Sequence, residues 1–72
     1  MIPLQIVTLP FKSGTSEQES HRGVMISRWL KEQGLNMGKD YTWRVDQGKR
    51  ELQFMFNGEA EAWATLITMR DL

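Results

Sequence analysis

A chain of 72 residues can form one small domain, and such a domain buries only about 60% of the surface that its unfolded chain exposes. With no cysteine and a single histidine, disulfides and a metal centre are not available to compensate, so self-association is the expected supplement. Nine basic residues balance nine acidic ones, which removes the general attraction to phosphates, so we do not expect nucleic acid as a partner.

The leading segment IPLQIVTLPF, residues 2–11, predicts a first strand. It is rich in β-branched and large apolar residues and is closed by Pro10. No basic region precedes it, and no apolar run in the chain approaches the roughly 18 residues needed to cross a bilayer. We therefore expect neither a signal peptide nor a membrane partner, and the absence of cysteine suits the reducing cytoplasm.

The loop KSGTS follows, between this strand and a helix. It contains glycine, small hydroxyls and a lysine, so it could hold a phosphate-type anion on free backbone amides. It lacks the glycine and lysine spacing of a nucleotide-binding P-loop, and its other interpretation is a turn followed by a helix cap. The candidate anion-binding residues are Lys12, Ser13, Gly14, Thr15 and Ser16.

The segment TSEQESHRGVMISRWLKEQG predicts the first helix. Ser16 and Glu19 have the spacing of a capping box, and Gly34 is typical of a helix end. The face predicted to pack comprises Met25, Ile26, Trp29 and Leu30. The face predicted to be solvated comprises His21, Arg28, Lys31 and Glu32.

The stretch DYTWRVDQGKRELQF predicts two strands of a hairpin, because apolar residues alternate with polar ones. A turn at residues 47–48 places Trp43 opposite Leu52, and Arg44 opposite Glu51. One continuous apolar face and oppositely charged neighbours agree with this register. A three-residue loop with a bulge at the glycine remains an alternative.

The last segment, NGEAEAWATLITMR, predicts a second helix. Asn57 is the expected N-cap, and Glu59 and Glu61 lie in the first turn, where the helix dipole favours acids. The expected apolar stripe comprises Ala60, Trp63, Ala64, Leu66 and Ile67.

These elements predict an α+β domain over residues 1–72 with the order β-α-β-β-α. The hairpin has one apolar face, so both helices should cover that face of a three-stranded sheet. The arrangement resembles a ferredoxin-like sandwich that lacks its last strand, in which the third strand lies between the first and second. Placing the first strand beside the second is the alternative.

Catalytic chemistry is not indicated. His21 lies on the polar side of its helix without a nucleophile spaced to meet it, and the glutamate pairs lie in first helical turns, where the dipole accounts for them. The hairpin aromatics share the apolar face, so they are core residues and not a platform for RNA bases. We expect no enzyme activity, no cofactor and no metal.

An apolar patch is expected on the uncovered face of the sheet. If Val7 and Leu9 point to the helices, Leu4 and Ile6 point away from them, with Met55 of the third strand alongside. The first strand would also be an edge with backbone groups free to pair. Leu4, Ile6 and Met55 are therefore the candidate interface, although scattered surface hydrophobic residues are the other interpretation.

The stretch from DYTWRV through FNGEAEAWATLITMR, a hairpin running into a short helix, resembles small uncharacterised proteins of tailed bacteriophages. The similarity contains no signature motif and implies a compact accessory protein without assigning a functional residue. The sequence thus predicts a non-enzymatic protein-interaction module, expected to be a homodimer or to bind another protein. The alternative is a small binder or enzyme that takes an anionic ligand at the KSGTS loop.

Overall fold

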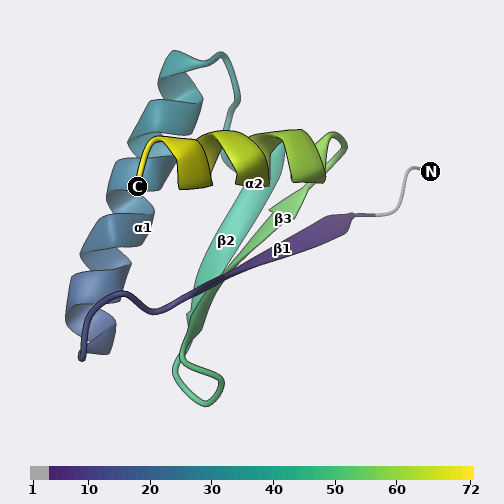
Figure 1. The fold of residues 1–72 in the computed structure, drawn as a ribbon. Coiled ribbons are helices and arrows are strands. Elements are labelled where there is room, and N and C mark those ends of the chain that lie inside the picture. Colours follow the sequence, from purple (N-terminus) through teal and green to yellow (C-terminus); the bar gives the residue numbers. More distant parts are fainter. Residues whose placement is uncertain (1–3) are drawn as a thin grey trace.

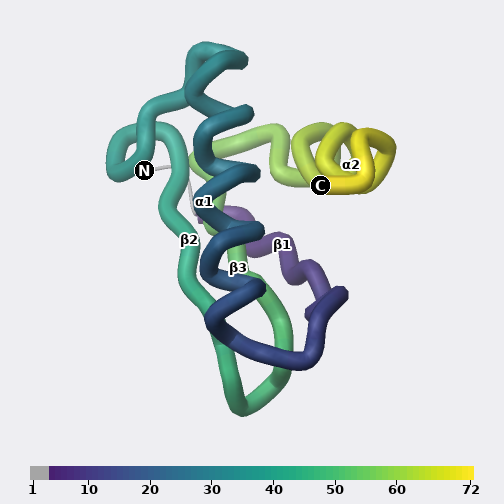
Figure 2. Tube along the Cα trace, turned by 90° about the vertical axis from the view of Figure 1, so that its left-hand side faces the viewer, coloured from purple at the N-terminus to yellow at the C-terminus, as the bar shows by residue number. Residues whose placement is uncertain are grey.

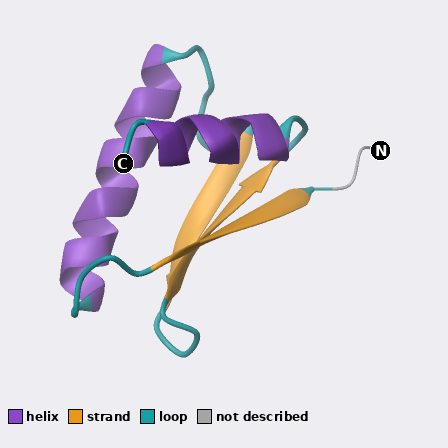
Figure 3. Ribbon diagram, viewed as in Figure 1, coloured by secondary structure: helices purple, strands orange, loops and turns teal. Residues whose placement is uncertain are grey.

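The chain has the predicted α+β architecture, a three-stranded antiparallel sheet with two helices (Figures 1 and 3). The computed structural model describes residues 4–72, so the start of the predicted first strand, at residues 2–3, lies outside the described residues. The elements are β1 (Gln5–Pro10), α1 (Ser16–Glu32), β2 (Tyr41–Asp46), β3 (Glu51–Phe56) and α2 (Ala60–Met69).

The strand order is β1-β3-β2, as expected for the first of the two predicted arrangements. Both β1 and β2 pair with β3 in antiparallel fashion, so β1 and β2 run parallel to each other at the two edges of the sheet. The alternative, with β1 beside β2, is wrong.

The predicted hairpin register is wrong by two residues. Trp43 lies opposite Phe54 rather than Leu52, and Arg44 lies opposite Gln53 rather than Glu51. The cause is the turn, which spans residues 47–50 and places Arg50 in the left-handed region at a φ of 54°. A shift of two residues leaves each side chain on the same face of the sheet, so the predicted apolar face of the hairpin is unchanged.

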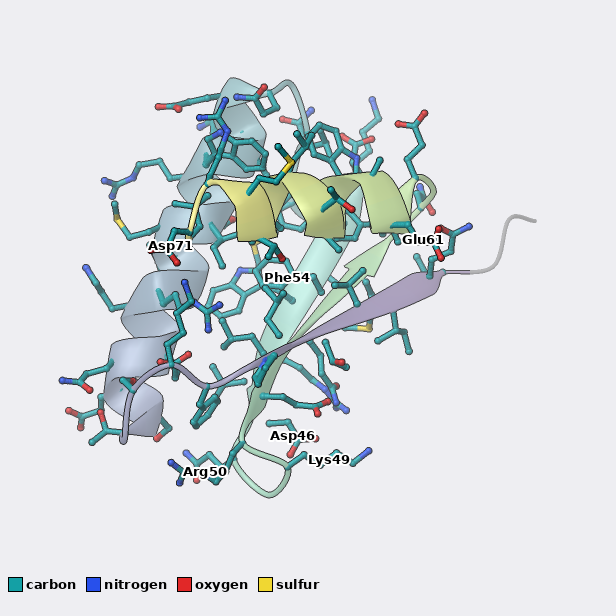
Figure 4. All side chains as sticks on the ribbon, viewed as in Figure 1. Asp46, Lys49, Arg50, Phe54, Glu61 and Asp71 are labelled. Atoms are coloured by element: carbon teal, nitrogen blue, oxygen red, sulfur yellow. The ribbon has the colours of Figure 1, made fainter. Side chains whose placement is uncertain are left out.

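Both helices cover the same face of the sheet, the one that carries the alternating apolar residues. Figure 2 shows α1 running alongside β2 while α2 lies on the β1 side. Phe54 lies at the centre of the buried cluster, beneath α2 (Figure 4). The cluster comprises Leu9, Ile26, Leu30, Tyr41, Leu52, Phe54, Phe56, Ala60 and Ile67.

The two helices also contact each other through Trp29 and Trp63, whose rings meet edge to face with centroids 5.9 Å apart. Two residues predicted to pack do not: Met25 is 41% exposed and Leu66 is 39% exposed. Each lies at the border of its helix's apolar stripe, where the small sheet no longer reaches.

Gly23 allows α1 to approach the sheet closely. An added Cβ at this position would lie 2.2 Å from the indole ring of Trp43. That ring stacks on Phe54 on β3, with centroids 5.7 Å apart. The glycine is therefore a requirement of packing, not of backbone conformation.

The helix ends differ from the predicted caps. Thr15, not Ser16, caps α1, because the Thr15 hydroxyl accepts a hydrogen bond from the Gln18 amide at 3.2 Å. Asn57 does not cap α2, which begins after Glu59 at a φ of 58°. The cap of α2 comes from another element: the Gln5 side-chain oxygen on β1 accepts from the Ala60 amide at 3.2 Å.

The end of α1 follows the prediction, with Gly34 in the left-handed region at a φ of 95° just beyond the helix. Neither α1 nor α2 is long and apolar enough to cross a membrane, within the part of the chain that the structure describes.

Candidate protein-interaction surfaces

Among residues 4–72 no helix covers the second face of the sheet. At one end of this face, polar side chains form a hydrogen-bond network around Gln53. Gln53, although it lies on this face, is only 7% exposed. Its amide nitrogen donates to Asp46 at 3.2 Å and to Glu51 at 3.0 Å, and its oxygen accepts from Arg44 at 2.6 Å. The network holds two neighbouring carboxylates in place beside the turn, where Figure 4 labels Asp46.

The other end of this face is apolar and contains two of the predicted interface residues, Ile6 and Met55, while the third, Leu4, directly precedes β1. We call Leu4, Ile6 and Met55 the apolar patch. Ile6 lies directly opposite Met55 in the β1–β3 register, and Leu4 lies two residues before Ile6. Ile6 is 64% exposed and Leu4 is 55% exposed, whereas Met55 is half-buried. The structure thus places Ile6 and Met55 side by side, as expected from the alternation.

Within the described part of the chain, the edge of the sheet at β1 presents backbone groups that have no partner. The Phe11 amide donates to the Arg50 carbonyl at 3.0 Å, which fixes the phase of the β1–β3 ladder. Because backbone groups of successive residues point to opposite sides of a strand, those of Ile6 and Thr8 point outward. The edge is closed after Thr8, since the Pro10 carbonyl accepts from Arg22 at 3.1 Å.

The KSGTS loop, predicted as a possible anion site, already binds a carboxylate of the protein itself. The Ser13 amide donates to Glu19 at 3.0 Å, and the Ser13 hydroxyl donates to the same oxygen. Lys12 pairs with Asp71 at 2.7 Å, near the end of α2 (Figure 4). Lys12 and the Ser13 amide, which would bind an anionic ligand, are therefore already paired with carboxylates of the protein.

Glu19 is the residue whose role the sequence did not reveal. Its side chain is 1% exposed, and Arg22 donates to its second oxygen at 2.8 Å. Burial by itself would raise the pKa of this carboxyl, but the hydrogen bonds from Ser13 and Arg22 outweigh burial and hold the pKa at about 2. Glu19 therefore stays ionised and fully engaged, which suits a structural anchor and not a general base.

Arg22 extends this anchor to the last residues. Besides Glu19 and Pro10, its guanidinium donates to the Leu72 carbonyl at 3.1 Å. One side chain thus joins the end of β1, the first turns of α1 and the segment after α2. Asp71, next to Leu72, has its pKa lowered by the hydrogen bond and charge of Lys12.

The other groups considered for chemistry lie apart from one another. His21 and Glu17 are exposed on α1, and Glu59 and Glu61 are exposed at the start of α2. Among residues 4–72 there is no group of three or more His, Cys, Asp or Glu side chains that could hold a metal ion.

A groove between α1 and β2, of about 650 Å³, was not predicted from the sequence. Its residues are Val24, Ser27, Arg28, Lys31, Asn36, Met37, Tyr41 and Trp43. The signal available in the sequence was weak: Val24 falls beside the polar face of the helix, and Met37 falls in a loop. In the structure Val24 is 46% exposed and Met37 is 58% exposed, both on this groove.

No protein-family model matches this chain, and no curated protein or solved structure matches it either.

Proposed function

We propose that this chain is a non-enzymatic protein-interaction module that forms a homodimer through the β1 edge and the apolar patch. The observation that carries the proposal is the exposure of Ile6, which is 64% exposed and lies beside Met55. Within residues 4–72 the outward backbone groups of Ile6 and Thr8 on this strand have no partner. Exposed apolar side chains next to an open edge favour the addition of another strand.

The composition of β1 supports the same conclusion. Edge strands are usually protected from pairing by charges or prolines, yet the segment QIVTLP carries no charge and has its proline only at the last position. The opposite edge strand, β2, carries both Arg44 and Asp46. The β1 edge is therefore the less protected of the two.

A symmetric pairing follows from the phase of the ladder. In an antiparallel pair centred on Val7, Ile6 lies opposite Thr8 of the second copy, and their outward backbone groups exchange hydrogen bonds. A twofold axis makes the two halves equivalent, as in most homodimers. The sheets of the two copies would then join into one, with all helices on the same face.

We propose in addition a fold family, a cellular location and a biological context for this chain. The truncated ferredoxin-like sandwich is supported by the strand order β1-β3-β2 with both helices on one face. A cytoplasmic location is supported by the lack of cysteine, and an accessory role in a tailed bacteriophage rests on the resemblance of the hairpin and last helix alone.

Ile6→Lys tests the proposal. A charge at this exposed position should abolish dimerisation while the far-ultraviolet circular dichroism of the monomer is retained, because Ile6 makes no contribution to the buried cluster. The molar mass is measured by size-exclusion chromatography with light scattering. Met69→Lys is the matched control, since Met69 is 76% exposed at the end of α2 and is not part of the apolar patch, so this variant should remain dimeric.

A monomeric wild type at high concentration would reject the homodimer. If both lysine variants dissociate equally, association depends on apolar surface in general and not on β1.

The anionic-ligand alternative has less support, because Glu19 already accepts the Ser13 hydrogen bonds and Asp71 pairs with Lys12. It would be favoured by a phosphate-dependent shift of the Gly14 amide resonance, which the homodimer proposal does not expect.

A further inference from the structure

The groove between α1 and β2 combines an apolar floor with a basic rim. Along α1, Val24, Arg28 and Lys31 lie at helical spacing on one stripe, next to the stripe that packs on the sheet. Across from them, Met37 and the partly buried ring of Trp43 complete the apolar lining. The groove is of the size that holds a drug-sized ligand or a few side chains.

The charge of the groove is uncompensated. Within residues 4–72 neither Arg28 nor Lys31 forms an ion pair, whereas Lys12 and Arg22 both do. The acidic side chains at the first turn of α2, Glu59 and Glu61, belong to a different pocket, on the β1 side. A ligand with carboxylates in the α1–β2 groove would therefore contact two cations without an ion-pair partner, and none of the residues that line the groove is acidic.

The outer edge of β2 forms one side of the groove. The loop at Met37 and Gly38 pairs with this edge at Tyr41, and beyond Tyr41 the backbone of the edge is open. The Asp40 carbonyl accepts from the Asn57 amide of the segment after β3, at 3.0 Å, so backbone groups of the alternate residues point away from β3. The Tyr41 carbonyl confirms this phase by accepting from Gly38 at 2.7 Å. The amides and carbonyls of Trp43 and Val45 then point outward, and no strand of residues 4–72 pairs with them.

We propose that this groove binds an acidic, extended segment of a partner protein, which adds to β2 as a further strand. Its backbone pairs with Trp43 and Val45, its apolar side chains contact Val24 and Met37, and its carboxylates lie against Arg28 and Lys31. The open backbone edge favours a peptide over a small apolar acid, which would leave those groups unpaired. The site lies on the edge opposite β1, so it goes beyond the proposed homodimer and does not depend on it.

A synthetic peptide tests the proposal directly. The probe alternates Thr with Ile, Val, Glu and Glu, so that in an extended conformation the apolar and acidic side chains share one face. We expect amide resonances of Met37, Trp43 and Val45 to shift on titration, and binding to weaken with added salt. The same peptide with Lys in place of Glu should bind at least about tenfold more weakly.

Two variants of the protein separate the charge from the backbone contribution. Lys31→Glu should lower the affinity for the acidic peptide about fivefold, whereas Lys49→Glu, an identical change in the hairpin turn, should leave it unchanged. Val45→Pro removes an outward amide, which an edge strand tolerates, and should abolish binding while the circular dichroism of the fold is kept. If Val45→Pro does not fold, Lys31→Glu and the peptide comparison still decide.

Several results would overturn the proposal. No shift at millimolar peptide, or shifts at the β1 edge instead, would show that the groove is not the site. Equal binding by the acidic and basic peptides would remove the charge argument. Equal shifts with hexanoate would identify a small-acid site and not a peptide groove.

Discussion

Glu19→Gln should remove most of the acid sensitivity of this fold. In the folded chain the Glu19 carboxylate accepts hydrogen bonds from Ser13 and Arg22, which hold its pKa at about 2 despite burial. In the unfolded chain the same group titrates near 4.5. As the pH falls, the unfolded state therefore takes up this proton first, and folding loses stability.

The size of the effect follows from the two pKa values. A pKa of about 2 against 4.5, at about 1.4 kcal/mol for each unit, gives roughly 3 kcal/mol. Because the folded pKa is the lower one, this stabilisation is complete above about pH 5 and is lost as the pH falls towards 2. In a domain whose free energy of unfolding is on the order of 5 kcal/mol, that is a large fraction.

The measurement is urea unfolding, followed by tryptophan fluorescence, over a series of pH values. The Gln variant should be less stable than wild type by roughly 3 kcal/mol at neutral pH, and the two should converge near pH 2. Glu17→Gln is the control, since Glu17 lies exposed in the same first turn and should follow wild type within about 0.5 kcal/mol. A difference between wild type and Glu19→Gln that stays constant from neutral to acid pH would refute the reasoning.

Two further substitutions test the packing and the caps. Gly23→Ala gains up to about 1 kcal/mol of helix propensity, but its Cβ would lie 2.2 Å from Trp43, so we expect a net loss of about 1 to 3 kcal/mol in urea unfolding. Ser20→Ala, exposed on the same helix, should be neutral or stabilising. Gln5→Ala removes the acceptor for the Ala60 amide and should cost about 1 kcal/mol, with hydrogen exchange accelerated first in the opening turn of α2; unchanged exchange there would contradict the cap.

The alternation in the sequence could predict the faces of the strands but not their register. Moving the pairing of Trp43 from Leu52 to Phe54 leaves both partners on the helix side, so the apolar pattern is satisfied by either. The charge pairing of Arg44 with Glu51 then favoured the wrong choice. The turn determines the register. There Arg50 adopts a left-handed conformation, which the sequence does not indicate because the residue is not a glycine.

The apolar patch was predictable because it depends on the same parity. Once Val7 and Leu9 face the helices, Ile6 must face away, and the strand order brings Met55 beside it. The structural role of Glu19 was not predictable, because the helix dipole already explained an acidic residue in the first turn of the helix. Of the partners of Glu19, Arg22 lies three residues further along the same helix, a spacing that the sequence shows, whereas Ser13 is identified only by the path of the loop in three dimensions.

The central strand makes its two pairings over very different lengths of chain. Its pairing with β2 closes a short loop, between Asp46 and Glu51. Its pairing with β1 closes a long loop, between Pro10 and Glu51, which contains the whole of α1 and β2. Closing the longer loop costs more entropy, so the hairpin can form early in folding and β1 must dock late. Until it docks, the far side of β3 is itself an open edge, and β1 from another chain can pair there in the same register. The chain's own β1 is tethered and therefore present at a high effective concentration, so exchange of the first strand is the expected misfolding route only at high protein concentration.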